Sequence, residues 1–221
     1  MNERVRRYVA ESLGTFALVF AGTGAVVADA LSGGAVTQVG ISIVFGAIVM
    51  MMVVAFGPIS GAHINPAVTI AFWAAREFEG REVVPYIISQ CVGAIVASGL
   101  LLWMYPTTPT LGQTLPIGAA APAFVMEVFL TTLLMLVILA CAVGHRLTTF
   151  FAGLTIGGAV MLCALFGGPL TGASMNPARS LGPALVSGDL STLWLYWAAP
   201  ITGALLAVGL YRVLWAETTI E

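Results

Sequence analysis

Charge is scarce in this sequence, and lysine is missing altogether. Only 8% of the 221 residues are charged, whereas a soluble domain carries about 25%. The eight basic residues are all arginines and form no basic patch, so we expect no nucleic-acid partner. Hydrophobic residues make up 59% of the chain. The composition therefore predicts an integral membrane protein.

Residues that commonly carry catalysis or bind metals are also few. The three cysteines, Cys91, Cys141 and Cys163, lie in apolar segments without the spacing of metal ligands, and we expect them to be small buried hydrophobic residues. No nucleophile–base pair, metal-ligand cluster or phosphate-binding loop is visible. The sequence thus predicts no enzyme activity, no cofactor and no metal.

Long apolar runs are frequent, and their lengths indicate an all-α membrane protein. Barrel strands would show alternating segments of about ten residues, which these unbroken runs do not. The six predicted spanning helices are Tyr8–Ala30, Thr37–Phe56, Val83–Tyr105, Pro122–Val143, Thr149–Gly167 and Leu193–Trp215. Two shorter segments, Pro66–Ala75 and Pro177–Val186, cover only half of a bilayer about 30 Å thick, at about 1.5 Å per residue. They are predicted to be re-entrant half-helices.

Each half-helix follows a copy of the same loop sequence. Both copies start with Gly-Pro, at Gly57 and Gly168, carry Gly-Ala in the middle and end with Asn-Pro-Ala. Asn is a preferred N-cap and Pro a preferred first helical residue, so each Asn-Pro-Ala predicts a helix start. The two sets are Asn65, Pro66 and Ala67, and Asn176, Pro177 and Ala178. We expect residues 57–64 and 168–175 to be non-helical, which membranes tolerate only inside protein or beside a water-filled cavity.

The two halves of the chain can be laid over one another. Glu11 and Thr15 in the first span correspond to Glu127 and Thr131 in the fourth. Each half holds an odd number of spans, so the second half enters from the opposite face, as an inverted repeat. We predict one transmembrane channel domain over residues 1–221, with repeats at 7–105 and 122–216 and a connector at 106–121.

The arginines predict the orientation. All but one fall on a single side if the spans alternate, and the positive-inside rule makes that side, with both termini, cytoplasmic. Those arginines are Arg4, Arg6, Arg7, Arg76, Arg81, Arg146 and Arg212. Arg179 lies on the other side, just after the second Asn-Pro-Ala, and needs a different role. The short termini favour a prokaryotic plasma (inner) membrane.

If the half-helices enter from opposite faces, their N-termini meet near the centre. Free backbone carbonyls would then lead to that point, and the Asn65 and Asn176 amides would act as donors there. The expected carbonyl rows are Gly61, Ala62, His63 and Ile64, and Gly172, Ala173, Ser174 and Met175. The positive helix ends and Arg179 would repel cations and hydronium. Such a route passes neutral polar molecules and blocks protons.

With these paired motifs, the chain resembles the aquaporin, or major intrinsic protein, family along essentially its whole length. The resemblance implies six spanning helices, two half-helices, one pore per subunit and a homotetramer. It also implies a selectivity filter on the extracellular side, at Phe45, Ala164, Ala173 and Arg179. The sequence around the second Asn-Pro-Ala is also similar to plant nodulin-type members and related bacterial ones, some of which pass metalloids.

Two sets of residues point to different selectivities within this family. Strict water channels usually have His where Ala164 stands, whereas glycerol facilitators usually have Asp where Ser180 stands. The residues that resemble the water-channel subgroup are Ser180, Ala184, Tyr196 and Trp197. We give the two filter alanines more weight, because the radius of a pore and its polar groups set its cut-off. The expected cargo is water with small uncharged solutes such as glycerol, urea, ammonia or undissociated metalloid acids.

Alternatives remain open at this stage. The protein could be a strict water channel, or a proton-coupled carrier that uses Glu11 and Glu127, since carboxylates inside membranes are often functional. We favour a structural role, in which each carboxylate accepts hydrogen bonds from the N–H groups of one loop. His63 could titrate as a gate, but packing beneath its loop is the favoured interpretation.

Overall fold

The computed structural model describes residues 2–108 and 110–215, and within them every regular element is helical. The elements are α1 (Glu3–Leu31), α2 (Thr37–Ser60), α3 (Pro66–Ala74), α4 (Gly80–Met104), α5 (Ala120–Leu139), a π-helical turn at Ala140–Gly144, α6 (Thr149–Thr171), α7 (Pro177–Ser187) and α8 (Leu193–Trp215). In this described part of the chain, six helices are long and apolar enough to cross a membrane, namely α1, α2, α4, α5 with its π turn, α6 and α8. The predicted fold class is confirmed.

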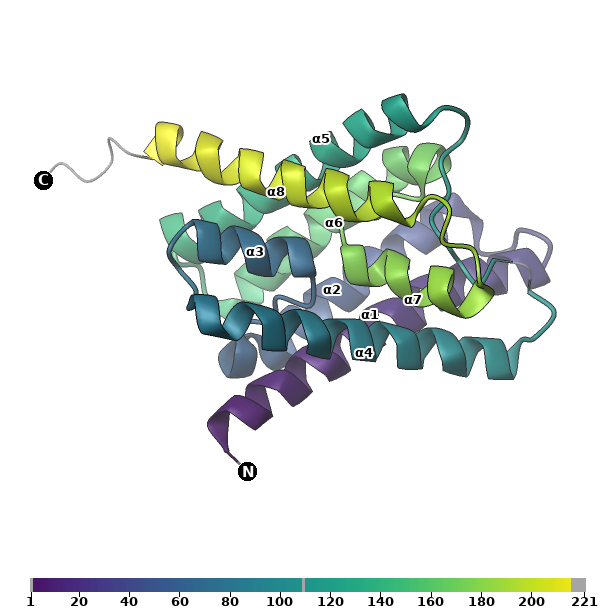
Figure 1. The fold of residues 1–221 in the computed structure, drawn as a ribbon, viewed down its shortest axis with the longest axis horizontal. Helices are drawn as coiled ribbons and strands as arrows, with labels where there is room; N and C mark the ends of the chain where they lie inside the picture. Colours follow the sequence, from purple (N-terminus) through teal and green to yellow (C-terminus); the bar gives the residue numbers. More distant parts are fainter. Residues whose placement is uncertain (1, 109, 216–221) are drawn as a thin grey trace, which may run out of the picture.

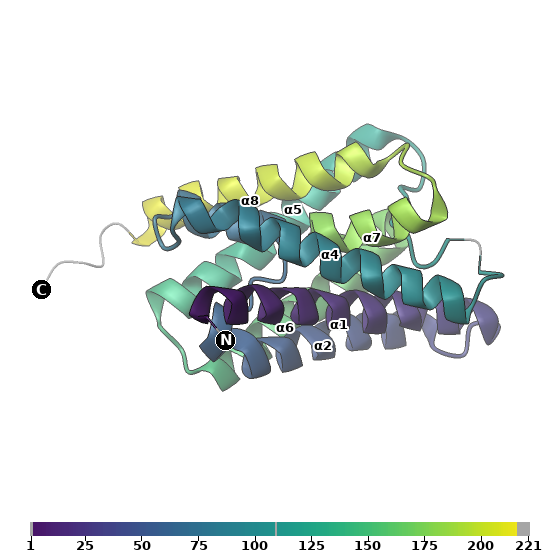
Figure 2. The same cartoon turned by 60° about the horizontal axis from the view of Figure 1, so that its bottom comes forward.

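The six long helices run along the long axis of the molecule, and the two short ones lie among them (Figure 1). Helices α3 and α7 follow one another along this axis, and both pack against α4 and α8. Figure 2, turned by 60°, shows the same arrangement, with α1 and α2 on the opposite side of the bundle from α8. The start of α1 and the end of α8 lie at one end of the molecule, which we call the terminal end; the other end is the distal end.

The two halves pack in the same way. Helix α1 crosses α4 at Gly93, where a Cβ would lie 2.1 Å from the carbonyl oxygen of Ser12. Helix α5 crosses α8 at Gly203, where a Cβ would lie 2.4 Å from the carbonyl oxygen of Val128. In both places a glycine lets two backbones approach closely, as is common between membrane helices. Contacts between α2 and α6 join the halves.

Several predicted boundaries were wrong, and the two loops are shorter than expected. Residues 57–60 continue α2 and residues 168–171 continue α6, so Pro58 and Pro169 lie inside helices. A proline in the last turn removes only one intrahelical hydrogen bond, while Gly61 and Gly172, in the left-handed conformation, close the helices with N–H bonds to Gly57 and Gly168. The non-helical backbone is therefore confined to 61–65 and 172–176.

Helices α1 and α4 begin a few residues before their predicted apolar runs, because polar first turns extend them. Helix α1 begins at Glu3 rather than Tyr8, since the side chain of Asn2 accepts a hydrogen bond from the N–H of Arg4 (3.1 Å). The connector joins α4 to α5, but its Pro109 lies outside the described residues, as does position 216, where the second repeat is predicted to end. The repeat boundaries stay a prediction. Cys141 and Cys163 are buried and Cys91 is half-buried.

Candidate pore

The two half-helices meet at Asn65 and Asn176. Each side-chain oxygen caps its own helix, accepting from the N–H of Ala67 (2.9 Å) or Ala178 (3.1 Å). Each side-chain nitrogen reaches into the other half: Asn65 donates to the carbonyl of Met175 (2.8 Å) and Asn176 to that of Ile64 (2.9 Å). Because an amide nitrogen carries two hydrogens, one donor of each asparagine remains available.

Backbone strain shapes both loops. Ala62 and Ile64 have positive φ values of 47° and 42°, and Ala173 and Met175 have values of 42° and 52°. A left-handed non-glycine residue costs about 1–3 kcal/mol and persists only where its surroundings over-determine it. The carbonyls of residues 61–63 receive no hydrogen bond from another described residue. The sequence reasoning did not anticipate that the Ile64 and Met175 carbonyls would receive the asparagine amides.

A buried carboxylate holds the first loop in this strained shape. Glu11 accepts from the N–H groups of His63 (2.9 Å) and Ile64 (2.7 Å) and from the hydroxyl of Ser60 (2.7 Å). The Nε2 of Gln90 donates to the same carboxylate (2.8 Å). Four donors converge on one side chain that is 0% exposed, so the charge is compensated within the protein.

The second loop is held in the same way. Glu127 accepts from the N–H groups of Ser174 and Met175 (both 2.9 Å) and from the hydroxyl of Thr171 (2.6 Å). Thr171 stands where the first half has Ser60, and each hydroxyl also accepts the N–H group of the second residue after it (both 3.1 Å). The two carboxylates therefore do equivalent work in the two repeats.

Two of the residues that resemble the water-channel subgroup rather than the glycerol facilitators, Ser180 and Tyr196, lie behind the second loop. Ser180 bonds to the hydroxyls of Ser174 (2.6 Å) and Thr114 (2.8 Å). Tyr196 donates to the carbonyl of Thr171 (2.7 Å). Both contacts support the loop from outside, so these residues act on the pore only through the loop.

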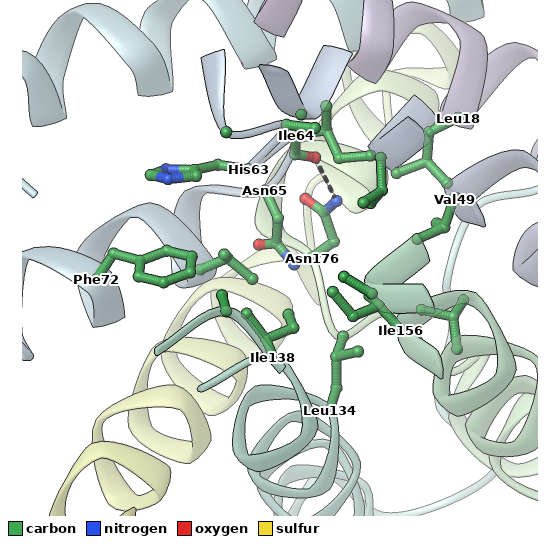
Figure 3. A pocket seen from close by; sticks show the side chains of 18 of the residues that line it. Leu18, Val49, His63, Ile64, Asn65, Phe72, Leu134, Ile138, Ile156 and Asn176 are labelled. Carbon is green, nitrogen blue, oxygen red and sulfur yellow. Dashed lines mark hydrogen bonds between the residues drawn. The ribbon is translucent and has the colours of Figure 1, made fainter. Parts of the chain in front are cut away.

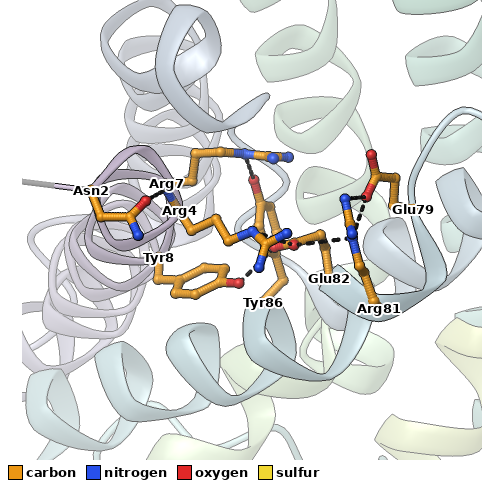
Figure 4. A network of polar contacts seen from close by, with 8 residues as sticks. All are labelled: Asn2, Arg4, Arg7, Tyr8, Glu79, Arg81, Glu82 and Tyr86. Carbon is orange, nitrogen blue, oxygen red and sulfur yellow. Dashed lines mark hydrogen bonds and ion pairs between the residues drawn. The ribbon is translucent and has the colours of Figure 1, made fainter.

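At the terminal end, the start of α1 is tied to α4 by a polar network (Figure 4). Glu82 accepts from the hydroxyl of Tyr8 (2.6 Å) and pairs with Arg4 (3.3 Å). Arg7 donates to the hydroxyl of Tyr86 (2.8 Å), which in turn donates to the carbonyl of Ser60 (2.9 Å). The network therefore ends on the residue that precedes the first loop.

His63 packs within aromatic side chains. Its ring stacks on Phe72, with 4.7 Å between centroids, and meets Phe78 edge-on, also at 4.7 Å. Its Nδ1 lies 3.2 Å from the hydroxyl of Thr69. A ring enclosed on these sides has little freedom to swing, which favours packing over gating.

A cavity of about 270 Å³ opens from the asparagines toward the terminal end. Residues 61–65 with Met175 and Asn176 form one wall. Figure 3 shows the apolar side chains that surround the asparagines, including Leu18, Val49, Leu134, Ile138 and Ile156. The cavity thus combines one polar stripe with apolar walls.

A second cavity of about 200 Å³ lies on the distal side of the asparagines. Phe45, Ala164, Gly172 and Arg179, all predicted from the sequence as site residues, line it together. Ala173, the fourth predicted filter residue, is buried at 7% exposure but lines neither cavity. Ser174, a predicted carbonyl residue, lines neither as well.

Arg179 is 4% exposed, and among the described residues its side chain makes one hydrogen bond. Its Nη1 donates to the carbonyl of Gly112 (2.8 Å), while its buried Nε has no hydrogen-bond partner among the described residues. The guanidinium carbon lies 4.9 Å from the centroid of the Phe45 ring, within the range of a cation–π contact. The side chain lines the distal cavity and therefore brings positive charge to it.

Sequence reasoning missed some residues around these cavities. Gln38 lines the distal cavity and Gln90 binds Glu11; a polar side chain within a spanning segment is a signal that could have found both. Gly112 receives Arg179 through its backbone carbonyl, and nothing in its sequence context predicts this.

Comparisons with known proteins show which family the chain belongs to. The profile described as Major intrinsic protein matches residues 1–211. The chain belongs to the major intrinsic protein family. Among the family's members, Aquaporin NIP1-1 of Zea mays is 43% identical over 211 residues, covering 95% of this chain and 75% of that protein. Nodulin-26 of Glycine max is 41% identical over 211 residues, covering 95% of this chain and 78% of that protein.

A solved structure in the family has the same fold. The X-ray structure of the aquaglyceroporin from Plasmodium falciparum matches with a TM-score of 0.88 and 25% identity, over 94% of this chain and 95% of that one. The resemblance inferred from the two loop motifs is confirmed. The chain is an integral, multi-pass membrane protein and a channel for water and small neutral solutes.

Proposed function

We propose that this channel passes water together with uncharged solutes of the size of glycerol and urea, and that it excludes ions and protons. The observation that carries the proposal is the distal cavity, which has the small side chain of Ala164 on its wall and Arg179 as its charged donor. A small apolar wall leaves room for a carbon skeleton, while the guanidinium binds hydroxyl or carbonyl oxygens. Ammonia and undissociated metalloid acids fit the same description.

Ion exclusion follows from the charges around the asparagines. The N-termini of α3 and α7 each carry roughly half a positive charge, and both face the point where Asn65 and Asn176 meet. Arg179 adds a charge that forms no ion pair within residues 2–108 and 110–215. A cation or hydronium at this point would meet positive potential, because the two nearby carboxylates, Glu11 and Glu127, accept from loop N–H groups and line neither cavity.

The carrier alternative needs a carboxylate that can exchange protons with solute or water. The oxygens of Glu11 and Glu127 are occupied by loop N–H and hydroxyl donors, and neither residue lines either cavity. These contacts favour a structural role for both. A strict water channel remains the second candidate, favoured by Ser180 and Tyr196, whose contacts lie behind the loop.

Orientation and assembly belong to the same proposal. The side chain of Arg212 donates to the carbonyl of Ala74, so its charge lies at the terminal end with Arg4, Arg7 and Arg81. The positive-inside rule then makes that end cytoplasmic and the distal cavity extracellular. We infer a plasma-membrane homotetramer with one pore in each subunit, and no cofactor.

Proteoliposome swelling tests the proposal. In a channel, the water and solute fluxes rise linearly with the osmotic or solute gradient, and proton uncouplers do not change them. Permeabilities for water, glycerol, urea and a metalloid acid, measured side by side, should all exceed those of empty liposomes. Flux that saturates and collapses with an uncoupler would support the carrier, and water flux alone would support the strict water channel.

A further inference from the structure

Phe45 is the one aromatic side chain in the predicted filter, and its position depends on what lies behind it. The ring is buried, at 8% exposure. One of its edges faces Gly22 on α1, and one of its faces lies under Arg179. It also lines the distal cavity. The ring therefore lies between Gly22 and the cavity.

Gly22 leaves space that the ring fills. A Cβ at position 22 would lie 2.1 Å from Cε1 of Phe45 and 2.5 Å from both Cδ1 and Cζ. Carbon atoms in contact lie about 3.5–4.0 Å apart, so the ring would have to move by more than about 1 Å to admit a methyl group. The ring and the bare backbone of α1 are in direct contact because residue 22 has no side chain.

The direction of that movement follows from the packing. Protein interiors are close-packed, so a displaced group moves toward existing empty space. The empty space beside Phe45 is the distal cavity, which it shares with Ala164 and Arg179. A ring pushed away from Gly22 therefore enters the cavity.

We infer that Gly22 is a positioning residue for selectivity. Because it lacks a side chain, the Phe45 ring can lie against α1, and the position of the ring sets the width of the distal cavity. The inference rests on the proposed function. A wide filter in this chain then has two sources, the small Ala164 on one wall and the withdrawn ring on another.

Gly22→Ala tests this, and the same helix supplies a matched control. A Cβ at Gly24 would meet only Cδ2 of Leu101, at an ordinary 3.6 Å, so Gly24→Ala adds a methyl group without touching the filter. In proteoliposomes, Gly22→Ala should lower the glycerol-to-water permeability ratio by about fivefold or more, which is about 1 kcal/mol of differential barrier. Gly24→Ala should change the ratio by less than about twofold.

A double-mutant cycle with Phe45→Leu shows whether the effect passes through the ring. With the ring removed, Gly22→Ala should no longer change the ratio. An unchanged ratio in folded Gly22→Ala, or an equal fall in the Phe45→Leu background, would overturn the inference. If Gly22→Ala alone does not fold, recovery of folding in the double variant supports it and continued failure overturns it.

The wild-type protein in the same assay separates this inference from the proposed function. If the wild type passes water but no glycerol, the proposed solute range is wrong. Water flux alone then tests the inference: Gly22→Ala should reduce the water flux, and Gly24→Ala should not. A water flux that both variants leave unchanged would overturn it.

Discussion

Gln38 donates a hydrogen bond from its side-chain nitrogen to the backbone carbonyl of Ala164, at 2.8 Å. The same nitrogen lies 3.2 Å from the hydroxyl of Ser42. The bond links α2 to α6 at the wall of the distal cavity. It holds the backbone at position 164 in place, so a substitution there acts on the pore mainly through its side chain.

Ala164→His should narrow the distal cavity and reduce solute flux more than water flux. An imidazole fills part of a space of about 200 Å³ and adds a polar group, so we expect glycerol permeability to fall by about tenfold and water by about twofold or less. Side-by-side swelling rates measure this. Ala164→Gly is the control, because it adds no bulk, and should not lower the ratio of glycerol to water permeability. If Ala164→His has the same solute selectivity as the wild type, Ala164 does not line the narrow part of the pore.

Arg179→Val should make the pore leak protons or small cations. The substitution removes a buried charge beside the positive ends of the half-helices, and we expect proton flux under a pH gradient to rise by about tenfold. A pH-sensitive dye inside the liposomes reports it. Arg146→Val removes an exposed arginine and serves as the control. A proton-tight Arg179→Val variant would show that the guanidinium lies off the conduction path.

Glu127→Gln should lower folded yield more than it lowers permeability per molecule. An amide has one oxygen in place of two, so the N–H of Ser174 or Met175 loses its acceptor at a cost of about 1–3 kcal/mol. Thermal unfolding in detergent and flux per reconstituted channel measure the two effects. Glu3→Gln changes an exposed carboxylate and should alter neither. Normal yield with lost transport would instead favour the carrier.

Tyr196→Phe should leave the glycerol-to-water ratio unchanged. The substitution removes the bond to the carbonyl of Thr171 (2.7 Å), which lies behind the loop, at a cost of about 1 kcal/mol of stability. We expect a lower unfolding temperature and the wild-type ratio. A change of the ratio in either direction would mean that Tyr196 itself sets selectivity, whereas we expect the filter alanines to set it.

Much of the fold could be predicted because membrane insertion leaves few choices. Apolar runs of spanning length must become helices in lipid, and the sixth run, Leu193–Trp215, was predicted to the residue. Helix ends were less predictable: Pro58 and Pro169 suggested loops, but each lies within three residues of a helix end, where a missing N–H disrupts little.

The sequence by itself determined the class of molecule and its central motif, since two Asn-Pro-Ala helix starts between apolar runs allow few other arrangements. The tertiary structure decided how the asparagines share their donors and where the filter residues lie. Asn65 reaches Met175, and Phe45 rests on Gly22, across 110 and 23 positions of the chain respectively. Contacts across such separations in the sequence depend on how the helices pack. A contact between remote segments leaves no periodic pattern in the sequence of either segment.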